Sequence, residues 1–274
     1  MTDEARGDAA NGDAAYRSTL VGVAAHVLAS TAFNATPKPL HIAGTRESHA
    51  ELFDALDRCG AADEARVVFD RFMAQRFGAG EVDAPGRRRR KASHLKLLQG
   101  WGMDASGAAG AVLKGWVESR FGLMPAWHGE RLGRFPSPAW VRYIEDKAGT
   151  RYHDTRLWGQ IDLLFEYCQW MLARFELLGP GPHATLWRGS TRVEEQLVAG
   201  SLRERHCTVR LNNLVSFSRT REQAGCFGDW VFEARVPMVK LLFVPGLVDS
   251  RALDGEAEVL AVGGDYEVGV SYAC

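Results

Sequence analysis

The hydrophobic pattern of this 274-residue chain changes its period at one place, the segment Gly179-Pro-Gly-Pro182. Before it, apolar residues recur every three or four positions, most clearly over 157–178, which is the spacing of one buried helix face. After it, apolar and polar residues alternate, as from Trp230 to Val236, which is typical of half-buried strands. A chain with one such switch fits neither an all-helical fold nor alternating βαβ units. We therefore expect an α+β protein.

The same pattern predicts how the chain is organised. We expect a flexible N-terminus at 1–15, a mainly helical region at 16–180 and a strand-rich region at 181–274, packed as one compact unit. Strands are predicted at 184–188, 208–216, 229–236, 239–244, 258–262 and 266–272. The run Gly263-Gly264-Asp265 predicts a turn between the last two strands.

Composition excludes several classes of protein. The chain has 33 Lys and Arg against 34 Asp and Glu, whereas domains that bind nucleic acid through bulk charge are strongly basic. It lacks the run of about 20 apolar residues that a membrane span needs, and its acidic start does not resemble a signal peptide. Five cysteines without a CxxC pair and eight scattered histidines argue against a metal site. We expect a soluble, cytoplasmic protein without bound metal.

Two further motifs are weak. Gly100-Trp-Gly102-Met-Asp-Ala105 matches the GxGxxA dinucleotide fingerprint, but that fingerprint needs a strand before it, and the preceding residues 93–99 are helix-like. We interpret the match as coincidence. The basic run Arg87–Lys91 suits either a solvated loop or contact with an acidic partner or nucleic acid.

Three elements of the strand-rich region are more informative together than alone. Arg188 ends a short apolar strand, Ser216 and Ser218 share one face of another, and Glu256 and Glu258 stand where a glycine turn enters a later strand. Each has an ordinary explanation, such as a salt bridge, a satisfied sheet edge or a solvated strand start. However, like charges two positions apart on one strand repel each other. A cleft that needs negative charge and an acid–base group explains the combination.

In this order the elements resemble the Arg–Ser–Glu signature of arginine-specific mono-ADP-ribosyltransferases. The segment REQAGCFG after the serine strand belongs to the resemblance, and Phe217 departs from it because many toxins have Thr between the two serines. The whole chain resembles the dinitrogenase reductase ADP-ribosyltransferases of nitrogen-fixing bacteria, through HATLWRGS, NNLVSFSRTREQAGCFGDWVFEARVP, KLLFVPGL and GEAEVLAVGGDYEV. The resemblance implies two small packed sheets around a cleft for NAD, which is the substrate.

The resemblance also implies roles for individual residues. Arg188, with the adjacent Gly189, would bind the pyrophosphate or ribose of NAD, since a guanidinium can hold two oxygens. Ser216 would orient the catalytic carboxylate, and Ser218 would support the strand or the nicotinamide side. Glu258 would bind the nicotinamide ribose and place negative charge near the developing cation.

The other carboxylate and two aromatic residues complete the predicted site. Glu256 would orient the acceptor guanidinium and take its proton, since a protonated guanidinium is a poor nucleophile. Trp187 and Phe227 either stack on nicotinamide or belong to the core, and the sequence does not separate these alternatives.

The resemblance implies partners as well. The acceptor would be an arginine of the nitrogenase iron protein, whose modification reversibly stops nitrogen fixation, and a PII-type protein would regulate the enzyme. We expect a monomer that docks its target through the helical region. Two alternatives stay open: a non-catalytic nucleotide-binding module, and an NAD glycohydrolase that transfers only to water.

Overall fold

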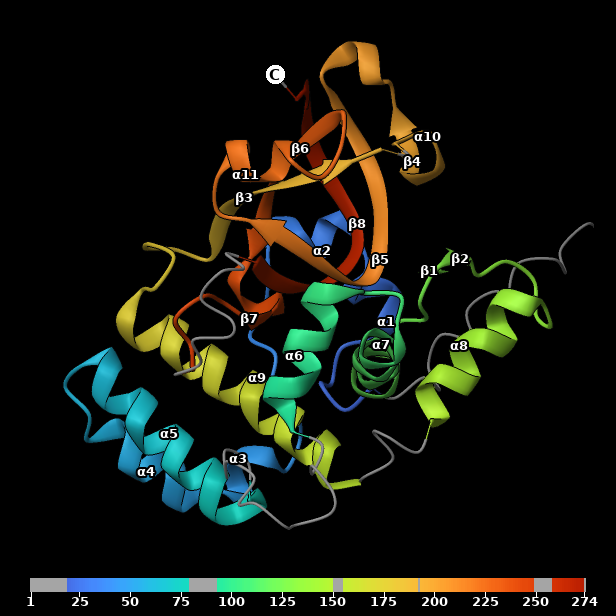
Figure 1. Cartoon of the computed structure of the whole chain (residues 1–274). Helices are drawn as coiled ribbons and strands as arrows, with labels where there is room; N and C mark the ends of the chain where they lie inside the picture. The colour runs from blue at the N-terminus through green and yellow to red at the C-terminus, as the bar shows by residue number, and fades with distance from the viewer. Residues whose placement is uncertain (1–18, 79–92, 150–154, 192, 249–257, 274) are drawn as a thin grey trace, which may run out of the picture.

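A computed structural model describes residues 19–78, 93–149, 155–191, 193–248 and 258–273. Strands gather on one side of the molecule and the long helices on the other (Figure 1). The described helices are α1 Ala25–Leu28, α2 Thr31–Ala35, α3 Thr45–Ser48, α4 Ala50–Asp57, α5 Ala62–Phe77, α6 His94–Met103, α7 Ala108–Phe121, α8 Pro138–Ala148, α9 Thr155–Phe175, α10 Val193–Gln196 and α11 Arg221–Gly225, with 3₁₀ turns η1 Leu202–Glu204 and η2 Met238–Lys240. None of these is long and apolar enough to cross a membrane.

The longest helix, α9, confirms the predicted periodic stripe but ends earlier than expected. Its apolar residues, among them Ile161, Leu164 and Cys168, are buried. It stops at Phe175 because Glu176 takes a positive φ of 48°, and the N–H of Gly179 then donates to the Glu176 carbonyl in a turn. The segment from Gly179 to Pro182 therefore lies beyond the helix end.

The strands are β1 Trp127–His128, β2 Glu130–Arg131, β3 His183–Ser190, β4 Leu197–Gly200, β5 His206–Ser218, β6 Trp230–Pro237, β7 Leu241–Phe243 and β8 Glu258–Tyr272. Apart from the β1–β2 pair, they form one antiparallel sheet in the order β4-β5-β3-β6-β8-β7. The sheet closes on itself, because β5 also pairs with β8 and meets β3 at Trp187 and Ser218. The α+β class is confirmed, whereas the two expected sheets are hydrogen-bonded into one.

The predicted turn at Gly263-Gly264-Asp265 is wrong, because β8 runs through it as one strand. The pairing of β5 with β8 instead shifts register between Leu211 and Leu214, opposite these glycines. A Cβ on Gly263 would lie 1.6 Å from the carbonyl oxygen of Asn212. Glycine is therefore needed here because two strands approach each other closely. In the sequence, the same pair of glycines is indistinguishable from a turn signal.

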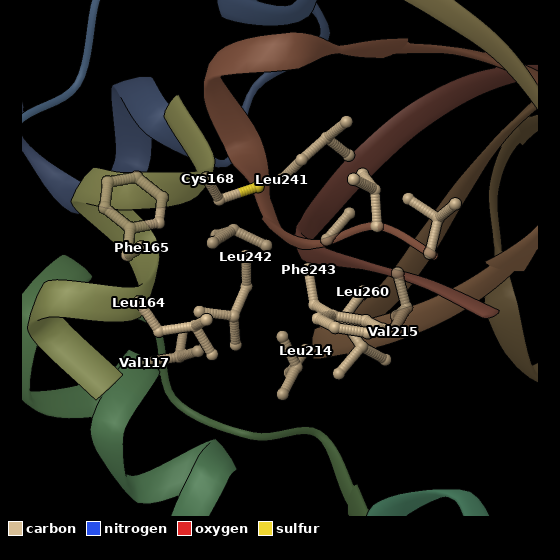
Figure 2. Packing of buried hydrophobic residues seen from close by; sticks show 14 of the residues in the cluster. Val117, Leu164, Phe165, Cys168, Leu214, Val215, Leu241, Leu242, Phe243 and Leu260 are labelled. Atoms are coloured by element: carbon tan, nitrogen blue, oxygen red, sulfur yellow. The ribbon is translucent and has the colours of Figure 1, made fainter. Parts of the chain in front are cut away.

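The helical and strand-rich regions share one hydrophobic core. Figure 2 shows side chains of α7 and α9 facing those of β5, β7 and β8, and the same cluster includes Val117, Leu164, Phe165, Cys168, Leu214, Val215, Leu241, Leu242, Phe243 and Leu260. Burial of this apolar surface is the main force that holds the regions together.

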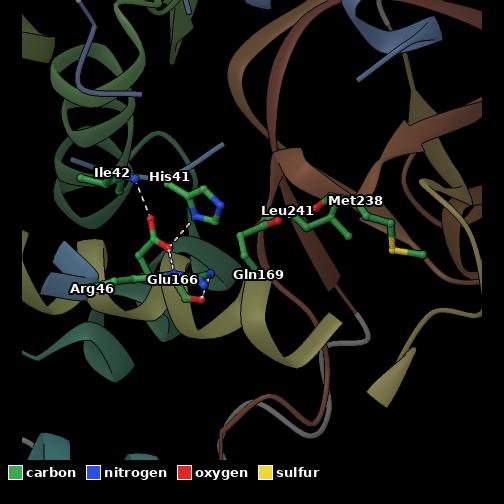
Figure 3. A network of polar contacts seen from close by, with 7 residues as sticks. All are labelled: His41, Ile42, Arg46, Glu166, Gln169, Met238 and Leu241. Carbon is green, nitrogen blue, oxygen red and sulfur yellow. Dashed lines mark hydrogen bonds and ion pairs between the residues drawn. The ribbon is translucent and has the colours of Figure 1, made fainter. Parts of the chain in front are cut away.

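Polar contacts of α9 fix this arrangement (Figure 3). The carboxylate of Glu166 is fully buried, accepts from the N–H of Ile42 and from Nε of Arg46, and lies 3.1 Å from Nδ1 of His41. A buried carboxylate is tolerated when it is paired and hydrogen-bonded in this way. Nearby, Nε2 of Gln169 donates to the carbonyl oxygens of Met238 and Leu241, at 3.2 and 2.8 Å. One face of α9 thus holds the N-terminal segment, and another holds the start of β7.

Candidate active site

A cavity of about 410 Å³ opens between the helices and the closed sheet. Its walls come from both regions of the chain, and include Trp101 of α6, Lys114 of α7, Trp127 of β1, Arg188 of β3, Ser216 of β5 and Phe227 after α11. Four of the predicted site residues line the cavity, namely Arg188, Gly189, Ser216 and Phe227, whereas Glu258 is not among the described residues that line it. The cavity therefore adjoins the Arg–Ser–Glu elements.

Arg188 is held by the neighbouring strand. Its Nη1 donates to the main-chain carbonyl oxygen of Ser216 at 2.8 Å, across 28 residues of sequence. Burial lowers the pKa of Arg188, and the charge of Glu258 opposes that shift. A guanidinium nonetheless stays charged at neutral pH. Its Nε is buried and has no acceptor among the described residues, so a buried donor is available to an anionic ligand.

The predicted serine and glutamate are brought together by the pairing of β5 with β8. Oγ of Ser216 donates to Oε2 of Glu258 at 3.2 Å, across 42 residues of sequence. The register places Ser218 opposite Glu258 and Ser216 opposite Leu260, so the serine and the carboxylate are diagonal neighbours on one face. Arg188, Ser216 and Glu258 therefore form one connected group.

Gly189 and Phe227 lie together at the cavity wall. A Cβ on Gly189 would stand 2.1 Å from the carbonyl oxygen of Ala224 and 3.0 Å from Cβ of Phe227. Glycine thus allows α11 to rest directly on β3. Phe227 keeps 63% of its surface exposed although it lines the cavity, so it is available to an aromatic ligand rather than packed in the core.

Trp187 and Ser218 lie where β3 meets β5, and neither is among the described residues that line the cavity. Nε1 of Trp187 donates to Oε2 of Glu233 on β6 at 3.2 Å. The structure thus places Arg188 at the cavity and the adjacent Trp187 away from it, as alternate residues of a strand point to opposite faces. Glu256 and the run Arg87–Lys91 lie outside the described residues.

The GxGxxA match has no role as a dinucleotide fingerprint. Gly100 and Gly102 lie inside the last turn of α6, whereas the fingerprint needs them in the turn between a strand and a helix. The interpretation as coincidence is confirmed. Trp101, between the two glycines, is not among the predicted site residues, yet its indole Nε1 donates to Oγ of Ser216 at 2.8 Å.

A second residue that sequence reasoning missed is Lys114. It is buried at the cavity wall, donates from Nζ to the carbonyl oxygen of Trp127 at 3.0 Å, and lies 3.1 Å from Nδ1 of His128. Nε2 of His128 in turn lies 2.9 Å from Oδ2 of Asp146. Burial lowers the pKa of Lys114 to about 8 and also lowers that of His128. Nothing in the local sequence marks a lysine of this kind, since its hydrogen-bond partners come from β1 and are linked in turn to Asp146 of α8.

Two asparagines of β5 fasten this wall to the sheet. Nδ2 of Asn213 donates to the carbonyl oxygens of Lys114 and Leu123, each at 2.9 Å. Asn212 accepts from the N–H of Ala126 and donates to the carbonyl of Trp127, also at 2.9 Å. The register shift in β5 thus turns two side chains toward the helical region. Within the described ranges, no group of three or more His, Cys, Asp or Glu is placed to hold a metal ion.

Comparison with known proteins identifies the family of this chain. The family model for dinitrogenase reductase ADP-ribosyltransferase matches residues 18–270. This chain belongs to that family. A relative from Rhodospirillum rubrum, named NAD(+)–dinitrogen-reductase ADP-D-ribosyltransferase, is 44% identical over 265 residues, which cover 94% of this chain and 95% of the relative. No solved structure matches the chain. Because the family match spans the helices as well as the strands, the helical wall of the cavity belongs to the family's shared region.

Proposed function

We propose that this chain is a mono-ADP-ribosyltransferase that moves ADP-ribose from NAD to one arginine of the nitrogenase iron protein and releases nicotinamide. The observation that carries the proposal is the connected group of Arg188, Ser216 and Glu258, of which Arg188 and Ser216 line the cavity. Family membership and the name of the 44% identical relative support the substrate and the acceptor protein. Transfer to this acceptor would reversibly inactivate nitrogen fixation.

The first chemical step breaks the bond between C1′ of the ribose and the nicotinamide nitrogen. The bonding electrons leave with nicotinamide, and the sugar becomes oxocarbenium-like. Glu258 places negative charge near that developing cation and binds the ribose hydroxyl, which stabilises the transition state more than the substrate. Arg188 offers its buried Nε–H to the pyrophosphate side. Phe227 stacks on nicotinamide, because it is exposed at the cavity. Trp187 does not take this role, because it is hydrogen-bonded to Glu233 away from the cavity.

The second step forms a bond between an acceptor guanidinium nitrogen and C1′. A protonated guanidinium must lose a proton as this bond forms, and the proposal assigns that proton to Glu256. The assignment rests on the spacing of the two glutamates in the sequence and on the family's preference for arginine. Water would replace the guanidinium in a glycohydrolase, where a second carboxylate of this kind is not needed.

The proposal extends to the setting of the reaction. The helical region, 16–180, serves for target docking and regulation, a PII-type protein is the regulator, and the enzyme is a cytoplasmic monomer that needs no metal. Cys59, Cys168, Cys207 and Cys226 are free thiols, as expected in a reducing compartment.

The decisive experiment uses NAD labelled in its adenylate part. The purified protein is incubated with this NAD and with an extract of nitrogen-fixing cells, and both transferred label and free nicotinamide are measured. We expect label on one arginine of the iron protein, and its loss in Glu258→Gln. We expect Glu256→Gln to lose transfer while it keeps some NAD hydrolysis. Nicotinamide release without protein labelling would identify a glycohydrolase. Folded wild-type protein that binds NAD without either product would identify a non-catalytic module.

A further inference from the structure

One side chain of the helical region, Trp101, is connected to the carboxylate of the proposed site through Ser216. Trp101 lies in the last turn of α6, is 4% exposed, and lines the cavity. Figure 1 shows one end of α6 lying against the sheet beside β5. The indole Nε1 is 2.8 Å from Oγ of Ser216, and that same Oγ is 3.2 Å from Oε2 of Glu258. The three side chains form a chain of two hydrogen bonds.

The direction of both hydrogen bonds is fixed by chemistry. An indole N–H can only donate, so Oγ of Ser216 must accept from Trp101. The ionised carboxylate of Glu258 can only accept, so the hydroxyl proton of Ser216 must lie toward it. Meanwhile the main-chain carbonyl of Ser216 is occupied by Nη1 of Arg188. A serine hydroxyl that lacked the indole donor would be free to turn about its Cβ–Oγ bond.

We propose that Trp101 is a positioning residue that acts through Ser216 to hold the Glu258 carboxylate ionised and correctly oriented. This inference rests on the role of Glu258 in the proposed function. A hydrogen bond to the charged form of a carboxylate favours that form, and a chain of hydrogen bonds polarises each of its members. The helical region thereby completes the NAD-splitting site in addition to any docking role.

The competing explanation is that the indole N–H merely needs a buried partner, as buried tryptophans usually do. Trp170 of α9 provides the matched control. Its Nε1 donates to Oδ1 of Asp57 at 2.7 Å, it is 8% exposed, and it is not among the described residues that line the cavity. Loss of either N–H removes one indole hydrogen bond of similar length. Only the bond of Trp101 leads to Glu258.

The kinetic test replaces each indole by its benzothienyl isostere, in which sulfur stands in place of the N–H and the ring volume is kept. Trp101→Phe, which also lacks the indole N–H, is the corresponding variant made from a natural amino acid. Release of nicotinamide from NAD is measured against pH for the full chain. With the isostere at 101 we expect kcat to fall by about 3- to 10-fold, the worth of one hydrogen bond, and KM for NAD to change by less than about 2-fold. The acidic limb of the profile should move about half a unit toward higher pH. The isostere at 170 should leave kcat and the acidic limb of the pH profile unchanged.

An NMR measurement tests the same inference without turnover. In the wild-type chain, the indole ¹H–¹⁵N signal of Trp101 should shift with a titration that disappears in Glu258→Gln and in Ser216→Ala. The Trp170 signal should be the same in all three proteins. Suppose that the enzyme needs Glu258 but that the isostere at 101 leaves kcat and the acidic limb of the pH profile unchanged. This result would overturn the positioning role of Trp101 and would leave the proposed function standing. If the wild-type protein releases no nicotinamide, the proposed function is overturned. The NMR titration then decides whether Trp101, Ser216 and Glu258 are connected by the two hydrogen bonds.

Discussion

Nη1 of Arg188 donates to the main-chain carbonyl oxygen of Ser216 at 2.8 Å, so the first two elements of the Arg–Ser–Glu signature are joined directly. The arginine is thus a strand-to-strand link, and in the proposed function it also binds the substrate. One end of its guanidinium holds β5, and its buried Nε–H remains for the substrate.

Replacement of Arg188 by lysine should separate these two tasks. A lysine ammonium is a compact charge without the planar fork of donors, so it cannot hold the carbonyl and an anion in the same geometry. We expect Arg188→Lys to raise KM for NAD by at least about tenfold, as for the loss of a charged hydrogen bond. Steady-state kinetics of nicotinamide release provide the measurement. Arg235→Lys, on an exposed position of β6, is the control, and an equal effect of both changes would contradict the role of Arg188.

Gly189→Ala should disturb the cavity through the backbone. The added Cβ would meet the carbonyl oxygen of Ala224 at 2.1 Å, so α11 must move away from β3 and take Phe227 with it. Overpacking of this kind costs about 1–3 kcal/mol of unfolding free energy. Chemical denaturation measures that loss, and KM for NAD should rise with it. In the control Gly225→Ala, the new Cβ has an ordinary contact of 3.7 Å, and stability should hold or increase. Similar losses in both variants would contradict the close-packing argument.

Phe227→Ala should affect binding more than folding. The side chain is 63% exposed, so its removal leaves no deep cavity and should change stability by less than about 1 kcal/mol. If the ring stacks on nicotinamide, KM for NAD should rise several-fold, in line with about 1 kcal/mol for an aromatic pair. Met103→Ala, at an 86% exposed position at the end of α6, is the control. Unchanged NAD binding in Phe227→Ala would remove this residue from the site.

Lys240 should make stability depend on pH. Its ammonium is fully buried, 3.4 Å from the Gly263 carbonyl oxygen and over the rings of Phe33 and Tyr266. Burial lowers its pKa to about 7, against the opposing charge of Asp265, which is itself paired with Arg210. Above pH 7 the unfolded chain therefore binds more protons than the folded chain does, so stability rises with pH until the lysine of the unfolded chain titrates near 10.

Lys240→Met should remove the contribution of this lysine to the rise. The free energy of unfolding, measured with urea at pH 7, 8 and 9, should increase less steeply in the variant than in the wild-type chain. Lys114, whose pKa burial lowers to about 8, supplies part of the rise that remains. Each pH unit corresponds to at most about 1.4 kcal/mol for one group. The control is Lys38→Met, since Lys38 is exposed, and it should keep the wild-type slope. Identical slopes in all three proteins would show that Lys240 does not titrate in this range.

The sequence reveals the part of this fold that depends on local pattern. Alternation locates β3, β5 and β6, and the stripe on α9 follows from its spacing, because each segment carries its own burial signal. The order of Arg188, Ser216 and Glu258 is likewise visible, since each stands at a strand position where its side chain has a defined face. The register that brings Ser216 close to Glu258 follows from the long pairing of β5 with β8, and Arg188 of β3 reaches Ser216 through its side chain.

The rest depends on contacts between distant segments. Trp101 and Ser216 are 115 residues apart, and the periodicity of α6 marks the tryptophan only as apolar. The hydrogen-bond partners of the Lys114 side chain come from β1, which the sequence does not associate with it. The sequence predicts a turn at Gly263 because glycine is common both in turns and where two strands approach closely, and only the structure distinguishes the two cases. Closure of the sheet at Trp187 and Ser218 involves one residue pair, which is too little to leave a pattern.

The amide of Asn213 has a consequence for protein engineering. It donates to the carbonyls of Lys114 and Leu123, and a β5 strand transplanted into another scaffold would carry that amide, buried, without either acceptor. Residues 181–274 therefore cannot be transferred to another scaffold without loss, although they contain the whole Arg–Ser–Glu signature. New acceptor specificities are better sought by changing the cavity rim within the intact chain than by grafting its strands.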